Sequence, residues 1–191
     1  MSDESLILAI DNGTQSTRAL LFNARGDLVA KGREEIEPYV SPEPGWAEQD
    51  PDYYWQSIGN ACRALWANTE ARPEQVKGVT VTAQRGTVVN LDSNGDVLRP
   101  AIIWLDQRRS PGPITVGPLW RLAFRLLGLT ETIRRLGEQT QANWIAAHQP
   151  DIWARTRHFL LLSGYLNWRL TGRFVDSIGS QVGYLPFDYK R

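Results

Sequence analysis

The first thirty residues alternate between short apolar runs and short polar stretches. Apolar residues fill positions 6–10 and 19–22, and a third apolar run begins at position 28. Short apolar runs bounded by Gly, Asn and Asp are typical of buried strands joined by turns. We therefore predict an antiparallel meander of three strands, in which the polar stretch 11–18 forms the loop between the first two.

A helix is expected to follow the meander after a loop. The stretch 38–48 is rich in Pro and Gly, which predicts an ordered surface loop. Asp50 is suited to cap a helix and Pro51 to occupy its first position, and we expect the helix to run to about Asn68. Apolar residues recur in this stretch at helical spacing: Trp55, Ile58, Cys62, Leu65 and Trp66.

Three further apolar stretches predict strands. The first, 76–83, is rich in β-branched residues. The next two, 87–91 and 97–104, flank Asn94 and Gly95, and Asn-Gly between apolar runs is a strong signal for a hairpin. Together with the meander, these stretches predict a mixed sheet with the polar stretch of residues 11 to 18 at one end.

From Pro111 onward the pattern becomes helical. Apolar spacing predicts several short helices and a last one from Asp151 to about Thr171, which Gly172 would end. The stretch 174–188 is rich in turns. The chain therefore divides into a sheet-rich part (1–110), a helical part (111–172) and a return to the sheet (173–191).

Composition limits the location and the partners of the protein. The 191 residues carry 21 Lys and Arg against 21 Asp and Glu, so no overall charge attracts nucleic acid or an anionic membrane, and a small molecule is the favoured partner. The apolar runs are too short or too interrupted to span a bilayer, and the acidic N-terminus does not resemble a signal peptide. The single cysteine fits a reducing cytosol. We expect a cytoplasmic protein, either a monomer or a homo-oligomer.

The polar stretch 11–18 carries candidate chemistry. Gly13 lets the backbone approach a ligand, and residues 14–16 add side-chain donors to the N–H groups of the loop, which suits phosphate oxygens. Arg18 would add a forked cation, and Asp11, at a strand end, is a hard oxygen ligand for Mg²⁺. The alternative is a plain hairpin turn whose polar residues meet only water.

Two more polar groups follow predicted strand ends. Gln84 and Arg85 offer an amide and a guanidinium, which together can hold several hydroxyls. Further on, the aromatic ring of Trp104 precedes Asp106 and Arg108. Sugars and polyols are bound by such groups, because a ring packs on C–H faces and charged groups hydrogen-bond hydroxyls. The alternative is that Arg85, Asp106 and Arg108 form ordinary ion pairs and that Trp104 lies in the core.

These motifs together resemble a known family. Asp-x-Gly-Thr-x-Ser-x-Arg between two apolar strands is similar to the first phosphate-binding motif of the FGGY carbohydrate kinases, members of the superfamily of actin, Hsp70 and hexokinase. Gln84-Arg85-Gly86, followed by Trp104-Leu105-Asp106-Gln107-Arg108, resembles the segments of that family that line the substrate pocket. The stretches 44–51 and 158–172 resemble its helix-entry segment and a late helix, so the resemblance covers nearly the whole chain.

The resemblance implies an α/β fold of the actin-like ATPase (ribonuclease H-like) class, with ATP and Mg²⁺ as cofactors. It implies phosphorylation of a sugar or polyol hydroxyl, with catalytic roles for Asp11 and Arg18 and with Asp11 holding the metal. The implied cofactor-binding residues are Asn12, Gly13, Thr14, Gln15, Ser16 and Arg18. The implied substrate-binding residues are Gln84, Arg85, Trp104 and Asp106.

The resemblance also sets limits. In the family the general base is an Asp in a later Asp-Gln pair, and the adenosine pocket lies mainly in a second domain. We therefore expect this chain to be an N-terminal portion with little activity alone. Asp106-Gln107 shares the letters of that pair but belongs to the pocket motif. Gly86 stands where glycerol kinases carry Glu, and Arg85 where xylulokinases usually carry His, so neither substrate is assigned.

Three other functions remain open. One is an actin- or Hsp70-like ATPase that uses the loop for conformational switching, which the small-molecule motif around Trp104 argues against. Another is a ribonuclease H-type nuclease, which needs several clustered carboxylates and usually a basic face. The last is a catalytically inactive binding module, which nothing in the residues excludes.

Overall fold

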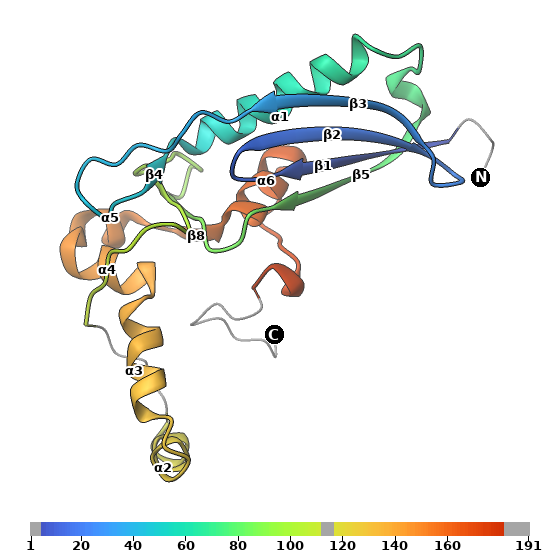
Figure 1. Ribbon diagram of the computed structural model, residues 1–191. Helices are drawn as coiled ribbons and strands as arrows, with labels where there is room; N and C mark the ends of the chain where they lie inside the picture. Colours follow the sequence, from blue (N-terminus) through green and yellow to red (C-terminus); the bar gives the residue numbers. More distant parts are fainter. Residues whose placement is uncertain (1–4, 112–116, 182–191) are drawn as a thin grey trace.

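The computed structural model describes residues 5–111 and 117–181 and contains two four-stranded sheets (Figure 1). The first sheet has the strand order β3-β2-β1-β5. Its strands are β1 (Leu6–Asn12), β2 (Ser16–Asn23), β3 (Leu28–Glu35) and β5 (Val76–Ala83). β1, β2 and β3 are antiparallel neighbours and β5 runs parallel to β1, which confirms the meander and the mixed sheet.

Helix α1 (Pro51–Trp66) packs on β2 and β3. Its start is the predicted one, because the side chain of Asp50 accepts a hydrogen bond from the N–H of Asp52 and Pro51 occupies the first turn. The helix lies very close to β3 at Gly32. A Cβ atom added there would come within 2.1 Å of the carbonyl oxygen of Ala61, so only glycine lets the helix lie at this depth.

The second sheet has the order β4-β7-β6-β8 and is antiparallel throughout. Its strands are β4 (Glu48–Gln49), β6 (Val88–Leu91), β7 (Ala101–Ile102) and β8 (His158–Leu161). The predicted hairpin is present, with Gly95 at a φ of +89° in its turn, but its second strand is short. β4 lies at the end of the stretch for which only a loop was predicted.

The expected long helix from Asp151 to Thr171 is wrong, because a strand interrupts it. The chain forms α5 (Pro150–Arg155), then β8, then α6 (Leu162–Thr171). β8 pairs with β6 on the side opposite β7. The paired residues lie about seventy positions apart in the sequence, so no local pattern reveals this strand. Gly172 ends α6 in the left-handed conformation, as predicted.

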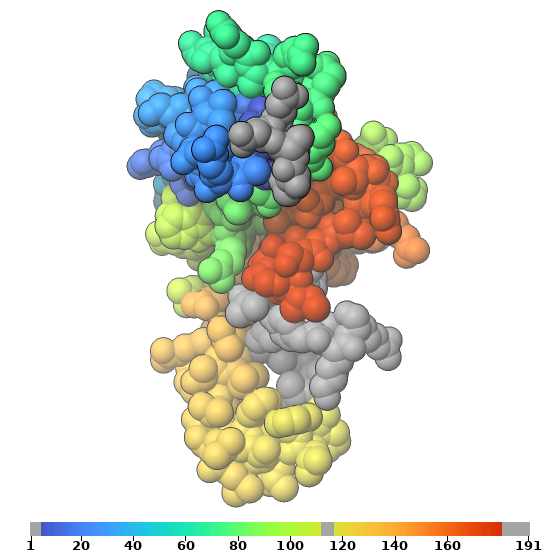
Figure 2. Space-filling view, turned by 90° about the vertical axis from the view of Figure 1, so that its right-hand side faces the viewer, coloured from blue at the N-terminus to red at the C-terminus, as the bar shows by residue number. Residues whose placement is uncertain are grey.

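An arm of the molecule consists of helices α2 (Pro118–Leu126) and α3 (Thr130–Glu138). The next helix, α4 (Gln141–His148), packs against the second sheet through Trp144 and Ile145. α2 lies at the far end of the arm, as Figures 1 and 2 show. Most of the apolar side chains of α2 are exposed, Leu119 by 79%.

The expected return to the sheet is not seen in the described part of residues 173–181, which holds only the short 3₁₀ turn Ile178–Gln181; a second such turn, Pro73–Gln75, precedes β5. Residues 182–191 lie outside the described part. No helix in the described ranges is long and apolar enough to cross a membrane.

The main core joins the first sheet to helices α1 and α6. Leu21 of β2, Leu65 of α1 and Tyr165 of α6 are completely buried in it. At its edge the hydroxyl of Tyr165 donates to Asp52, which also pairs with Arg169. These contacts fix the start of α1, and α1 in turn supports the loop between β1 and β2.

Candidate active site

The loop between β1 and β2 is a tight hairpin with residues 13–15 at its tip. The N–H of Gly13 donates to the carbonyl of Ser16 at 3.1 Å, which closes the turn. Asp11 and Arg18 are direct partners across the two strands, and Nη1 of the arginine lies 3.3 Å from Oδ2 of the aspartate. Both side chains are about half exposed, so this predicted catalytic pair faces solvent at the strand ends.

Asp11 is also held from the other side. The hydroxyl of Thr82, on the neighbouring strand β5, donates to Oδ1 of the aspartate at 3.1 Å. In residues 5–111 and 117–181 no group of three His, Cys, Asp or Glu side chains could form a metal cluster. A single carboxylate still fits Mg²⁺, because this ion commonly takes one or two carboxylates and completes its shell with water and substrate phosphates.

Asn12 supports the loop between β1 and β2 from the interior of the protein. Its side chain is completely buried, with Nδ2 donating to the hydroxyl of Thr17 at 2.8 Å, and Thr17 in turn lies 2.8 Å from the hydroxyl of Ser57 on α1. This corrects the prediction that the Asn12 side chain binds the cofactor, since the side chain is completely buried against Thr17 of β2 and Ser57 of α1. Ser16 is also almost covered, with 5% of its surface exposed.

Thr14 joins the two predicted binding segments. The indole Nε1–H of Trp104 donates to Oγ1 of Thr14 at 3.1 Å, and the threonine hydroxyl donates to Oε1 of Gln84 at 2.8 Å. The amide of Gln84 continues the chain by donating from Nε2 to the hydroxyl of Tyr54 at 2.9 Å. The predicted cofactor loop and the predicted substrate segments therefore meet at one hydroxyl group.

Tyr54 is a member of this network that the sequence analysis missed. Only 2% of its surface is exposed, and burial raises the pKa of its phenol to about 12, although the hydrogen bond from Gln84 acts in the opposite direction. The phenol is therefore neutral at physiological pH. Its position four residues before Ile58, on the buried face of α1, is the signal that could have identified it.

Arg85 and Gly86 follow Gln84 at the end of β5. Arg85 is exposed, so its guanidinium is available at the surface beside the network. Gly86 has a φ of +76°, and a Cβ atom added there would lie 3.2 Å from Cβ of Trp104. A glutamate in this position would need a strained backbone and would press against the base of the indole ring.

Trp104 and Asp106 have opposite surroundings although they belong to one motif. Trp104 is 52% exposed and is not a core residue. The side chain of Asp106 is 2% exposed, and its Oδ2 accepts from the N–H of Ala47 at 2.7 Å and lies 2.7 Å from Nη2 of Arg108. Asp106 is therefore not a substrate ligand in this geometry, and the alternative of an ion pair with Arg108 is confirmed.

The buried charges around Asp106 form a larger cluster. Arg108 also pairs with Glu48 at 2.8 Å, and Glu48 pairs with Arg99 at 2.5 Å. The guanidinium of Arg108 lies over the rings of Trp46 and Trp144, at 4.2 and 4.4 Å from their centroids. This buried ion cluster, Glu48, Arg99, Asp106 and Arg108, ties the second sheet to helix α4.

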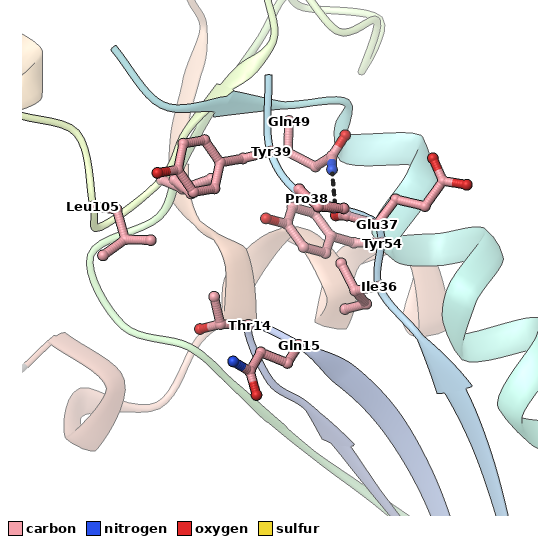
Figure 3. A pocket seen from close by; sticks show the side chains of 10 residues that line it. Thr14, Gln15, Ile36, Glu37, Pro38, Tyr39, Gln49, Tyr54 and Leu105 are labelled. Carbon is pink, nitrogen blue, oxygen red and sulfur yellow. Dashed lines mark hydrogen bonds between the residues drawn. The ribbon is translucent and has the colours of Figure 1, made fainter. Parts of the chain in front are cut away.

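A cavity of about 260 Å³ adjoins the hairpin loop (Figure 3). Thr14 and Gln15 form one side of it, and Tyr39, Gln49 and Tyr54 form others. The amide of Gln49 donates to the carbonyl of Glu37 at its rim. Trp104 and Arg85 do not line this cavity, so it lies beside the predicted substrate segments and not between them.

Comparisons with known proteins find similar carbohydrate kinases. The chain is 30% identical to the glycerol kinase of Streptococcus uberis over 187 residues, which cover 96% of this chain and 37% of the relative. It is 28% identical to the xylulose kinase of Lactococcus lactis, with 97% of this chain and 36% of the relative covered. The chain therefore spans little more than a third of the length of these curated relatives.

Solved structures show the same fold. The xylulose kinase of Rhodospirillum rubrum superimposes with a TM-score of 0.67 at 28% identity, over 89% of this chain and 35% of that one. The ADP-bound glycerol kinase of Plasmodium falciparum superimposes with a TM-score of 0.62 at 21% identity, over 88% and 34% of the two chains, which supports the fold alone. The predicted actin-like α/β fold is thus confirmed. The family model "FGGY family of carbohydrate kinases, N-terminal domain" matches residues 6–184, and the chain belongs to this family.

Proposed function

We propose that this protein acts as an ATP-dependent carbohydrate kinase, which transfers a phosphoryl group to a hydroxyl of a sugar or polyol. The observation that carries the proposal is the hydroxyl of Thr14, which receives the indole N–H of Trp104 and donates to Gln84. A phosphate loop and an alcohol-binding segment must lie next to each other for such a transfer. Family membership supports the same reaction.

The loop would bind the phosphates of the nucleotide. Phosphoryl transfer mainly requires the protein to align the reacting groups and to neutralise the charge of the phosphates. Within the described ranges, the backbone N–H groups of Thr14 and Gln15 at the tip form no hydrogen bond, so they are open to phosphate oxygens. Arg18 would add positive charge, and Asp11 would hold Mg²⁺, which supplies charge neutralisation when bound.

The acceptor alcohol would lie against Trp104. The exposed face of the indole offers a surface for the C–H groups of a sugar, and Arg85 offers hydrogen-bond donors to hydroxyls. Gly86 supplies no carboxylate, and its backbone conformation disfavours any larger residue. We therefore propose a substrate other than glycerol.

The proposal also covers the general base and the adenosine pocket. The chain spans 37% of the Streptococcus uberis glycerol kinase, and we propose that a carboxylate base and the adenosine pocket correspond to regions of such relatives beyond the matched part. On this proposal residues 1–191 form the N-terminal part of the first kinase domain. The cytoplasmic location, the need for Mg²⁺ and the oligomeric state stay predictions.

The test is a coupled assay of ADP release with pentuloses, hexuloses, pentitols and glycerol as acceptors. It compares the 191-residue chain with a longer form of the protein that continues past residue 191. We expect acceptor-dependent turnover by the longer form and little or none by the shorter one. Full turnover by the 191-residue chain would refute the proposal that the base and the adenosine pocket lie outside it. ATP hydrolysis by the longer form that is not stimulated by any acceptor would refute the proposed kinase activity.

A further inference from the structure

We propose that the hydrogen bond from the indole N–H of Trp104 to the hydroxyl of Thr14 couples acceptor binding to nucleotide binding. The inference rests on the proposed kinase function and adds to it a named route of communication. Trp104 is a positioning residue in this role, because its N–H acts on the phosphate loop through Thr14.

The hydroxyl of Thr14 can form only a limited number of hydrogen bonds. A threonine hydroxyl has a single proton and two acceptor lone pairs. In Thr14 the proton is donated to Gln84, and one lone pair receives the N–H of Trp104. The orientation of the hydroxyl at the loop tip is therefore set by two groups that lie 70 and 90 residues away in the sequence.

The two partners of the Thr14 hydroxyl are held with different firmness. Gln84 is fixed from behind, since its Nε2 donates to the buried hydroxyl of Tyr54 and its backbone N–H donates to the carbonyl of Asn12. The side chain of Trp104 is 52% exposed, and near Gly86 only its base is approached, because a Cβ atom added at Gly86 would lie 3.2 Å from Cβ of Trp104. Of the two partners that meet at the Thr14 hydroxyl, Trp104 is thus the more adjustable one.

The indole of Trp104 has an exposed face and an N–H group that binds Thr14, and both belong to one rigid ring. An acceptor that packs on the exposed ring face restricts the ring, and the same ring holds Thr14 through its N–H. A ligand that favours one ring position therefore favours one arrangement of the loop tip, and this effect is reciprocal by thermodynamic linkage. Acceptor and nucleotide should then bind more tightly together than separately.

The experiment measures the affinity for MgADP by calorimetry with the longer form of the protein. Each titration is done without an acceptor, with D-xylulose and with the best acceptor found in the activity screen. In the wild type we expect the acceptor to tighten MgADP binding by about fivefold or more, the lower range of typical coupling. In Trp104→Phe, which keeps a ring but loses the N–H, we expect the ratio to fall to about one.

A matched control tests whether any exposed tryptophan has this effect. Trp120 on α2 is 63% exposed and lies on the distant helical arm, so Trp120→Phe should leave the coupling ratio unchanged. A second pair of variants addresses the other end of the bond. Thr14→Ser keeps the hydroxyl and should retain coupling, whereas Thr14→Val is similar in shape without a hydroxyl and should lose it.

The outcomes separate this inference from the proposed function. A wild type with acceptor-dependent turnover, but with equal coupling ratios in Trp104→Phe and in the wild type, would overturn the inference and leave the kinase intact. The same holds if Thr14→Val keeps the coupling of the wild type. A wild type without acceptor-dependent turnover would overturn the kinase proposal first, and the inference with it.

Discussion

Two polar regions of this molecule share one short motif, residues 104–108, yet they have opposite characters. The network around Thr14 consists of neutral groups, is partly exposed and ends on an exposed tryptophan. The buried ion cluster around Arg108 consists of charged groups, and the guanidinium of Arg108 lies over two indole rings. The motif from Trp104 to Arg108 supplies one residue to the first region and two to the second. A motif match therefore identifies a segment, whereas the direction of each side chain decides its role.

The largest expected effect comes from breaking the buried cluster. Replacing Asp106 by Ala removes one of the two carboxylate partners of the buried Arg108 guanidinium, and we expect the free energy of unfolding to fall by about 3 kcal/mol. Urea denaturation followed by circular dichroism measures the change. Near-native stability together with a selective loss of acceptor binding would show that Asp106 is a substrate ligand after all, and would remove the contrast between the two regions.

Gly86 lies against Trp104 and allows a test of how tightly the indole is confined. In Gly86→Ala the left-handed backbone is strained and the new methyl group meets Cβ of Trp104, so we expect a loss of about 2 kcal/mol and weaker acceptor binding. Gly128 is the matched control, because it has a similar φ of +68° and no heavy atom within 4 Å of an added Cβ. Gly128→Ala should cost only the backbone strain, about 1 kcal/mol, and leave binding unchanged. Equal effects of both substitutions would mean that Trp104 is not confined.

The phenol of Tyr54 makes the network sensitive to alkaline pH. Its pKa is raised from 10 to about 12 in the folded protein, so the folded state keeps the proton while the unfolded state loses it. This contribution to stability is fully present below pH 10 and is lost as the pH rises toward 12, at about 1 kcal/mol per pH unit. Urea denaturation at pH 9, 10 and 11 should therefore show a steeper decline in the wild type than in Tyr54→Phe. Parallel declines in the two proteins would argue against a buried phenol.

The smallest expected change in stability is at the exposed pair of Asp11 and Arg18. Exposed ion pairs contribute little, so Asp11→Asn should change the free energy of unfolding by less than about 1 kcal/mol. The same substitution should abolish most acceptor-dependent turnover of the longer form, because the proposed metal ligand is lost. An Asp11→Asn protein with normal turnover would place the metal elsewhere.

Much of the fold could be predicted because its signals are local. The meander, α1 and the strand 76–83 follow from apolar spacing and from the residues Asp50 and Pro51 at the helix start. β8 could not be predicted, because its apolar residues adjoin a helical pattern and its strand conformation depends on pairing with β6. Pairing of this kind is a tertiary effect that overrides local propensity.

The site could be predicted only in part, for a related reason. Sequence indicates that Thr14, Gln84 and Trp104 lie at strand ends, but it does not say which of them touch. The burial of Asn12 and Asp106 depends on contacts with α1 and with Ala47, Arg108 and their neighbours. Tyr54 was missed because its hydroxyl acquires a polar role only once α1 lies beneath the loop.

The glycine at position 32 has a consequence for the loop between β1 and β2. Because α1 rests directly on β3 at this point, the height of the whole helix above the sheet is set there. Any larger residue would act as a spacer, and the lifted helix would carry the phenol of Tyr54 away from Gln84. A single hydrogen atom in place of a methyl group at Gly32 thus keeps α1, and with it Tyr54, at the depth that the hydrogen bond to Gln84 requires.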